Sequence, residues 1–168
     1  LVLIGGEAGV GKTTLAKRTL TGSGLQILEG LAVQGGTSPF GPVVEALRSY
    51  LRAAGETRFP EGPLIDHLAL LLPELGPAAP AGDRATLFEA IRQALATIGA
   101  QRPTALFLDD LQWADDATSE LLGALARSLD SEPLLLLGAF RSDELPRGHA
   151  VRRLRSELRR ASGLRQIT

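Results

Sequence analysis

Three uninterrupted apolar runs, each joined to a segment with helical spacing, constrain the fold of this chain more than any other feature. They are Leu1–Ile4, Thr104–Leu108 and Leu134–Phe140. A strand that is apolar at every position is covered on both faces, which is typical of parallel sheets packed between helices. Because strands and helices alternate along the sequence, it predicts an α/β fold whose parallel sheet has helices on both faces.

Capping residues and glycines predict where the other elements begin and end. Lys12–Leu20 is expected to be a helix, and Gln26–Val33 a further strand. Asp83 can cap a helix that we expect to end at Gly99. Asp115 or Asp116 can cap the helix after the second apolar run.

The tract Phe59–Gly82 is rich in Pro and Gly but contains the apolar piece Leu64–Leu72. It is too apolar for a linker, so we expect a helical insertion over residues 59–82. The full length of 168 residues suits one domain.

The composition indicates a globular protein without disulfides or a membrane span. An apolar fraction of 44% with 22% charged residues is globular. The chain has no cysteine, which excludes disulfides and thiolate metal sites and fits a cytoplasmic protein. No apolar run approaches the ~18 residues of a membrane span. There is no methionine and the first strand starts at Leu1, so we expect a core cut from a longer protein.

One glycine-rich segment points to phosphate binding. Gly6–Thr13 matches G-x-x-x-x-G-K-[ST] between a predicted strand and a predicted helix. Glycines let successive backbone N–H groups converge on phosphate oxygens, and the helix N-terminus adds its positive end. Lys12 can contact the β- and γ-phosphates, and the Thr13 hydroxyl can bind Mg²⁺. The predicted nucleotide-binding residues are Gly6, Glu7, Ala8, Gly9, Val10, Gly11, Lys12, Thr13 and Thr14.

Two adjacent carboxylates complete a site for a nucleotide with its metal. Asp109 and Asp110 follow an apolar strand, at the sheet edge where ligands bind in open parallel sheets. We expect Asp109 to orient Mg²⁺ through water and Asp110 to polarise a water for attack on the γ-phosphate. The alternative is that the pair begins a turn or caps a helix.

Arg141 ends the next apolar strand at the same edge. Its guanidinium can contact the γ-phosphate, or it can pair with Asp143 or Glu144 on the surface. Lys12, Asp110 and Arg141 are the predicted catalytic residues, whereas Thr13 and Asp109 are the predicted metal ligands. Gln112, which follows the acidic pair, could face the phosphates.

These segments carry a family resemblance. The quoted motifs are Gly6–Thr14, Asp109–Asp115 (DDLQWAD) and Gly138–Leu145, with further likeness at Pro39–Leu47 and Arg84–Leu95. The chain resembles the ATPase domain of STAND-class, AAA-like P-loop signalling ATPases. Within that class it is most similar to large ATP-binding LuxR-type transcriptional regulators and related cyclase- or kinase-linked ATPases.

The resemblance implies a P-loop NTPase fold of the ASCE type, a three-layer sandwich with an extra strand between the loop strand and the acidic strand. It implies ATP and Mg²⁺ as ligands, with the roles given above for Thr13, Asp109, Asp110 and Arg141. Gln112 stands where many relatives have His. On this resemblance we expect four parts of the relatives to be missing from this sequence: the adenine-side segment before the first strand, the lid or winged helix, the helical repeats and the DNA-binding helix-turn-helix.

Charge is unevenly distributed. Residues 147–168 hold seven arginines and one acid, so the rest of the chain is net acidic. The face with Arg152, Arg155 and Arg159 can contact nucleic acid, lie in solvent, or offer an interdomain or intersubunit arginine to ATP. We favour solvent, and expect no direct nucleic-acid contact from this segment and no membrane partner.

The leading hypothesis is an ATP-binding, slowly hydrolysing switch module whose partners are ATP, ADP and neighbouring domains, with possible ATP-dependent self-association. The runner-up is a nucleotide-binding scaffold without significant turnover. A P-loop small-molecule kinase is the third alternative, with the 59–82 insertion as its lid.

Overall fold

A computed structural model describes residues 1–168 except 37, 55–63, 81, 129–131, 161–164 and 168. The strands are β1 (Val2–Gly6), β2 (Gln26–Leu31), β3 (Thr104–Asp109), β4 (Leu134–Arg141) and β5 (Arg165–Ile167). The α-helices are α1 (Lys12–Thr21), α2 (Gly41–Ala54), α3 (Ile65–Leu68), α4 (Arg84–Gln101), α5 (Asp116–Ser128) and α6 (Ala150–Arg160). Two 3₁₀ turns are η1 (Pro73–Leu75) and η2 (Leu111–Trp113).

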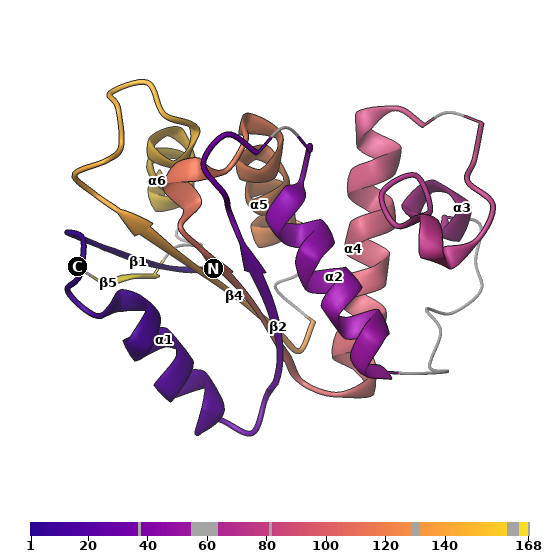
Figure 1. The fold of residues 1–168 in the computed structure, drawn as a ribbon, viewed down its shortest axis with the longest axis horizontal. Coiled ribbons are helices and arrows are strands. Elements are labelled where there is room, and N and C mark those ends of the chain that lie inside the picture. The colour runs from indigo at the N-terminus through magenta and orange to yellow at the C-terminus, as the bar shows by residue number, and fades with distance from the viewer. Residues whose placement is uncertain (37, 55–63, 81, 129–131, 161–164, 168) are drawn as a thin grey trace.

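The strands form one parallel sheet in the order β2-β3-β4-β1-β5 (Figure 1). This order confirms the predicted parallel α/β fold, and it places β4 between the loop strand β1 and the acidic strand β3. The register pairs Gly6 with Arg141 and Leu31 with Asp109. The carboxyl ends of β1, β2, β3 and β4 therefore meet at one edge, where open parallel sheets bind their ligands.

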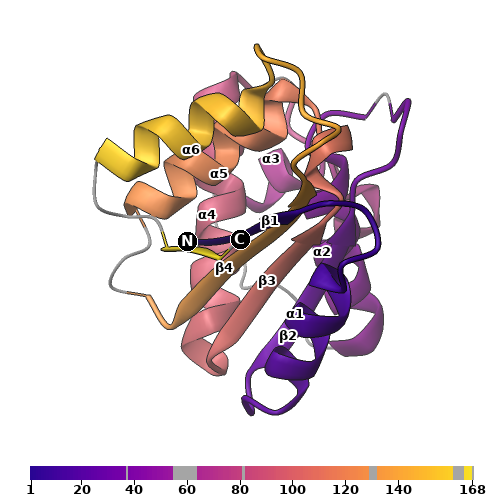
Figure 2. The ribbon, with the colours of Figure 1, turned by 90° about the vertical axis from the view of Figure 1, so that its left-hand side faces the viewer.

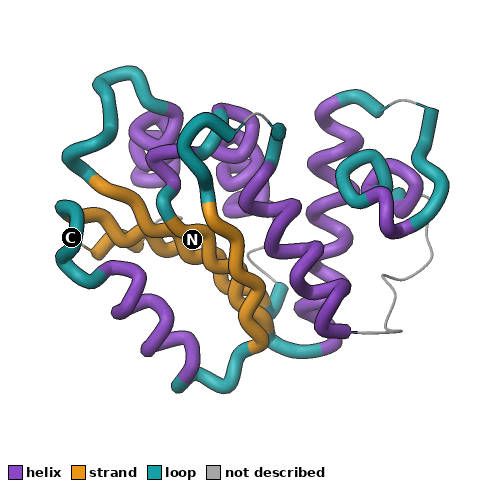
Figure 3. Tube along the Cα trace, in the orientation of Figure 1, coloured by secondary structure: helices purple, strands orange, loops and turns teal. Residues whose placement is uncertain are grey.

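Helices cover the sheet on both faces, as Figures 2 and 3 show for the layers on either side of the strands. The smaller core cluster lies under α1 and consists of Ile4, Ala16, Leu20, Ala105, Phe107, Leu137 and Ala139. The larger cluster joins the other face of the strands to α2, α4, α5 and α6. In β3, Leu106 and Leu108 belong to the larger cluster, whereas Ala105 and Phe107 belong to the smaller one. A strand buried on both faces explains the uninterrupted apolar runs.

Three helix termini test the capping predictions. The Asp83 carboxylate accepts the Thr86 N–H at 2.7 Å, which confirms it as the cap of α4. Asp115 caps α5 through the Thr118 N–H at 2.7 Å, while Asp116 is the first helical residue. The predicted end at Gly99 is wrong, because α4 continues to Gln101. Buried apolar packing of this last turn outweighs the low helix propensity of glycine.

The described part of the 59–82 tract packs against the body of the protein; residues 59–63 and 81 lie outside the described residues. Leu68 and Leu72 are buried in the larger core cluster. From α2, the Arg48 guanidinium donates to Glu74 at 2.6 Å and to the Leu71 carbonyl at 3.4 Å. These contacts hold α3 and η1 beside α2.

Several arginines of helix α6 contact other parts of the chain. Arg152 donates two hydrogen bonds to the Leu145 carbonyl, at 3.1 and 2.8 Å. Arg155 is half-buried, its guanidinium 5.2 Å from the Phe140 ring centroid. Burial, followed by the charges of Arg159 and Arg152, lowers the pKa of Arg155. The expectation that the arginine face lies in solvent is therefore wrong at Arg155, because its guanidinium lies over the Phe140 ring in β4.

No helix in the described ranges is long and apolar enough to cross a membrane.

Gly30 allows α2 to lie directly against β2. A Cβ on Gly30 would overlap the carbonyl group of Pro42. We expect Gly30→Ala to lower the free energy of unfolding by about 2 kcal/mol, because the helix must move away from the strand. Urea denaturation measures this value.

The matched control is Gly41→Ala, at the first residue of α2, where an added Cβ meets nothing within 4 Å. The free energy of unfolding of that variant should stay within about 0.5 kcal/mol of the value for the parent chain. Equal losses in the two variants would contradict the close approach at Gly30.

Candidate functional site

The loop between β1 and α1 has the backbone that the glycine pattern requires. Gly9 has φ 77° and Gly11 has φ 91°, both in the left-handed region. A Cβ at either position would meet no atom within 4 Å. These glycines are needed for conformation rather than for space. Residues 7–11 are exposed, at the N-terminus of α1, where the helix dipole favours an anion.

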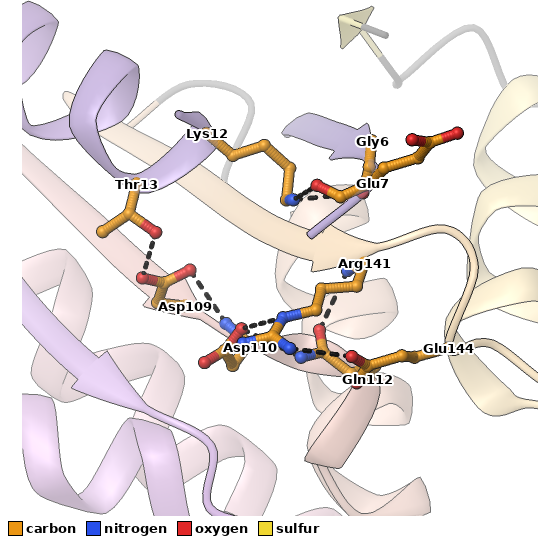
Figure 4. A network of polar contacts seen from close by, with 9 residues as sticks. All are labelled: Gly6, Glu7, Lys12, Thr13, Asp109, Asp110, Gln112, Arg141 and Glu144. Atoms are coloured by element: carbon orange, nitrogen blue, oxygen red, sulfur yellow. Dashed lines mark hydrogen bonds and ion pairs between the residues drawn. The ribbon is translucent and has the colours of Figure 1, made fainter. Parts of the chain in front are cut away.

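Lys12 folds back over this loop. Its ammonium donates to the carbonyl oxygens of Gly6, at 3.0 Å, and of Glu7, at 2.7 Å (Figure 4). The Glu7 side chain itself is exposed, and only its main-chain oxygen takes part. The contacts hold a positive charge at the mouth of the loop.

Thr13 and Asp109 meet although 96 residues separate them in the sequence. The Thr13 hydroxyl donates to Asp109 Oδ2 at 2.7 Å, and Asp109 Oδ1 accepts the Asp110 N–H at 2.9 Å. The strand order brings the start of α1 and the end of β3 together across the end of β4. Two predicted metal ligands therefore lie side by side (Figure 4).

This oxygen pair fits Mg²⁺. Magnesium takes one or two protein oxygens and completes its shell with phosphate oxygens and water. Within the described residues, no group of three or more His, Cys, Asp or Glu side chains could hold a metal by itself. The residues present thus suit a metal that arrives with a phosphate ligand.

Asp110 has an unusual backbone. With φ 52° and ψ 40° it is left-handed, a conformation that costs energy for any residue other than glycine. It separates the end of β3 from η2, and its carboxylate points toward Arg141 (Figure 4). Asp110 Oδ1 accepts a hydrogen bond from Gln112 Nε2 at 2.9 Å and lies 3.5 Å from Arg141 Nε.

Arg141 contacts two carboxylates at once. Its Nη1 donates to Glu144 Oε1 at 2.7 Å, in addition to the contact with Asp110. The Glu144 carboxylate, and then the charges of Asp110 and Asp143, raise the pKa of Arg141 above its ordinary value. The arginine thus lies at the ligand edge and also forms the surface pair weighed as its alternative.

Gln112 is the residue that sequence reasoning undervalued. Its side chain is only 4% exposed, and it bonds to Asp110 and to the Arg141 main chain rather than facing the loop. The signals in the sequence were its place two residues after Asp110 and, in the resemblance, its position where many relatives have His.

Thr14, Glu29 and Trp113 lie outside this network of polar contacts. Thr14 is exposed. Glu29 pairs with Lys17 at 2.7 Å on the surface, and this hydrogen bond raises the pKa of Lys17. Trp113 packs against the larger core cluster and lines a hollow of about 460 Å³ beside the end of β2.

The chain matches the sequence model of a known family. The sequence model described as AAA ATPase domain matches residues 1–137. That range includes the loop, Thr13 and the acidic pair but ends before Arg141. No curated protein matches the chain.

Proposed function

The chain belongs to the AAA ATPase domain family, and on that premise we propose that it is an ATP-binding, slowly hydrolysing switch module of a multidomain signalling or transcriptional regulator. Family membership by itself implies nucleotide binding. The regulatory role rests on the resemblance of residues 109–115 and 138–145 to STAND-class and LuxR-type proteins. ATP would favour one arrangement of the neighbouring domains or promote self-association, and hydrolysis would reset it.

The observation that carries the proposal is the contact between Thr13 Oγ1 and Asp109 Oδ2, at 2.7 Å. It joins the phosphate loop to the acidic strand. A strand–turn–helix that was glycine-rich by chance would have no reason to place its hydroxyl on a carboxylate of another strand. The Lys12 ammonium, 3.0 Å from the Gly6 oxygen, can turn from this carbonyl to phosphate oxygens.

Thr13 and Asp109 would hold Mg²⁺ through their oxygen atoms, with Asp109 acting directly or through water. When bound there, Mg²⁺ would supply positive charge that offsets the charge of the phosphates. The chain's own part is to orient the phosphates by the loop and by Lys12.

Asp110 is suited to accept a proton from the attacking water. Both of its contacts, with Gln112 and with Arg141, use Oδ1. Among the described residues none bonds to Oδ2, which is therefore the oxygen available to a water. Arg141, at the end of β4, would contact the γ-phosphate and balance its charge.

The same contacts favour a second candidate. A carboxylate held by an amide N–H and placed beside a guanidinium is also a common structural arrangement. In that case the chain would be a nucleotide-binding scaffold without significant turnover, and Asp110 would only shape the end of β3.

The metal assignment predicts a Mg²⁺-dependent affinity for ATP. Removing Mg²⁺ should weaken ATP binding to the parent chain about tenfold, because a charge-assisted contact contributes about 1.5–3 kcal/mol. Asp109→Asn should abolish most of that difference, since the amide is a poor ligand for a hard cation. Equilibrium binding of ATP with Mg²⁺ or with a chelator measures both effects.

Asp66→Asn is the matched control, because Asp66 is exposed in α3, far from the loop in sequence. It should keep the full Mg²⁺ effect. If Asp109→Asn retained the effect as well, Asp109 would not be a metal ligand.

A further inference from the structure

Gln112 is a buried amide that joins the ends of two strands. Its Nε2 donates to Asp110 Oδ1 at 2.9 Å, and its Oε1 accepts the Arg141 backbone N–H at 3.0 Å. Figure 4 shows the side chain between the two residues. Because a backbone N–H can only donate, Oε1 must face Arg141 and Nε2 must face Asp110. The orientation of the amide is therefore fixed by chemistry.

A second contact holds Gln112 from the side of α6. The Val151 N–H donates to His149 Nδ1 at 3.2 Å, so that nitrogen carries no proton. His149 Nε2 then carries the proton and donates to the Gln112 carbonyl at 3.0 Å. Both the main chain and the side chain of Gln112 are thus anchored.

Gln112 fixes the carboxylate of Asp110, whose backbone conformation costs energy. Asp110 is left-handed, and its carboxylate has Arg141 on one side and the Thr13–Asp109 pair on the other (Figure 4). A carboxylate on such a backbone needs an external contact to hold one rotamer. Gln112 provides that contact from within the buried side of the site.

We propose that Gln112 is a positioning residue for ATP hydrolysis, holding the Asp110 carboxylate at a fixed place relative to the end of β4. This inference rests on the proposed function, since it presumes that Asp110 handles the attacking water. Gln112 does not itself reach the reacting atoms. Its loss should slow hydrolysis without weakening the binding of ATP.

The experiment compares three variants of the 168-residue chain with the parent. Gln112→Leu keeps the volume and removes both side-chain bonds. Gln112→His restores one donor and one acceptor, because neutral imidazole carries one of each. Thr104→Val removes a different buried hydroxyl, which donates to the Arg102 carbonyl at the opposite end of β3.

The readouts are kcat for ATP hydrolysis, the Kd for ATP and hydrogen exchange of the Arg141 amide. Gln112→Leu should lower kcat about tenfold or more, leave Kd within about twofold, and accelerate exchange at Arg141. Gln112→His should recover most of kcat and of the exchange protection. Thr104→Val should leave kcat and Arg141 exchange unchanged.

Other results overturn the inference. Equal losses of kcat in Gln112→Leu and Thr104→Val would mean a general effect of destabilisation. A Kd that rises as much as kcat falls would place Gln112 in nucleotide binding. Unchanged hydrogen exchange of the Arg141 amide in Gln112→Leu would show that Gln112 does not hold the end of β4. A parent chain that binds ATP without hydrolysing it would instead refute the proposed turnover, and with it any catalytic effect of Gln112.

Discussion

Asp110→Asn should reduce ATP hydrolysis about 10²- to 10³-fold and leave the Kd for ATP within about threefold of the parent value. General-base catalysis contributes about 10²–10⁴ in rate, and an amide cannot accept the proton of the attacking water. The change preserves the local structure, because asparagine tolerates the left-handed backbone at φ 52° and its Oδ1 can still accept from Gln112. Phosphate release and equilibrium ATP binding, measured on the same preparation, give the two values.

Asp143→Asn is the control for charge alone. Asp143 is exposed on the loop after β4, and its charge acts on Arg141 without a hydrogen bond to it. Hydrolysis by this variant should stay within about twofold of the parent rate. Unchanged turnover in Asp110→Asn would reject the general base and favour the nucleotide-binding scaffold.

Local patterns were sufficient to predict β1, β3, β4 and the loop, whereas the strand predicted over Gln26–Val33 ends at Leu31. The first five residues of β3 are all buried and the strand is apolar nearly throughout, so its position did not depend on its neighbours. Gly6, Gly11 and Lys12 stand at the fixed spacings of the loop motif, and Gly11 has the left-handed backbone that only glycine adopts easily. Asp83 capped its helix as expected, because capping involves only residues three apart.

Contacts between distant residues could not be derived in this way. The place of β4 between β1 and β3 came from the family resemblance rather than from any pattern of residues. Gln112 bonds to the main chain of Arg141, 29 residues away, and neither residue type indicates the pairing. Gly99 misled the helix prediction because tertiary packing overrode its propensity.

The backbone conformation of Asp110 is another feature that the sequence could not predict. A left-handed aspartate after a strand is rare, and the sequence gives no sign of it. The contacts of the Asp110 carboxylate with Gln112 and Arg141 offset the energy that this backbone conformation costs, and only the structure reveals them. The acidic pair was therefore predictable as a pair, while the distinct placement of its two carboxylates was not.

The arginine-rich end gains a more specific meaning from the contacts of α6. Arg153 donates to the Gly148 carbonyl and lies 3.2 Å from Asp116. Arg155 stacks on Phe140, and Arg152 bonds to Leu145. Several of the guanidinium groups that make this segment basic thus have partners within the chain, which leaves fewer of them for a nucleic acid.

Lys12→Ala should weaken ATP binding by about two orders of magnitude. The ammonium lies at the mouth of the loop, 2.7 Å from the Glu7 carbonyl, and a charge-assisted contact with phosphate contributes about 1.5–3 kcal/mol. Its removal also releases the Gly6 and Glu7 carbonyls that it now holds, so the loop loses order before the ligand arrives. Titration with ATP in the presence of Mg²⁺ measures the change.

Lys17→Ala gives the matched comparison, because it removes the same side chain from the same helix. Lys17 is half-exposed and pairs with Glu29, on the edge strand β2. An exposed ion pair contributes at most about 1 kcal/mol to stability. The Lys17 ammonium bonds to Glu29 rather than to a carbonyl of the loop, so the ATP affinity of this variant should stay within about twofold of the parent value. Equal affinities of the parent and Lys12→Ala would reject the loop as the phosphate site, whereas equal losses in both lysine variants would indicate that only the net charge of α1 matters.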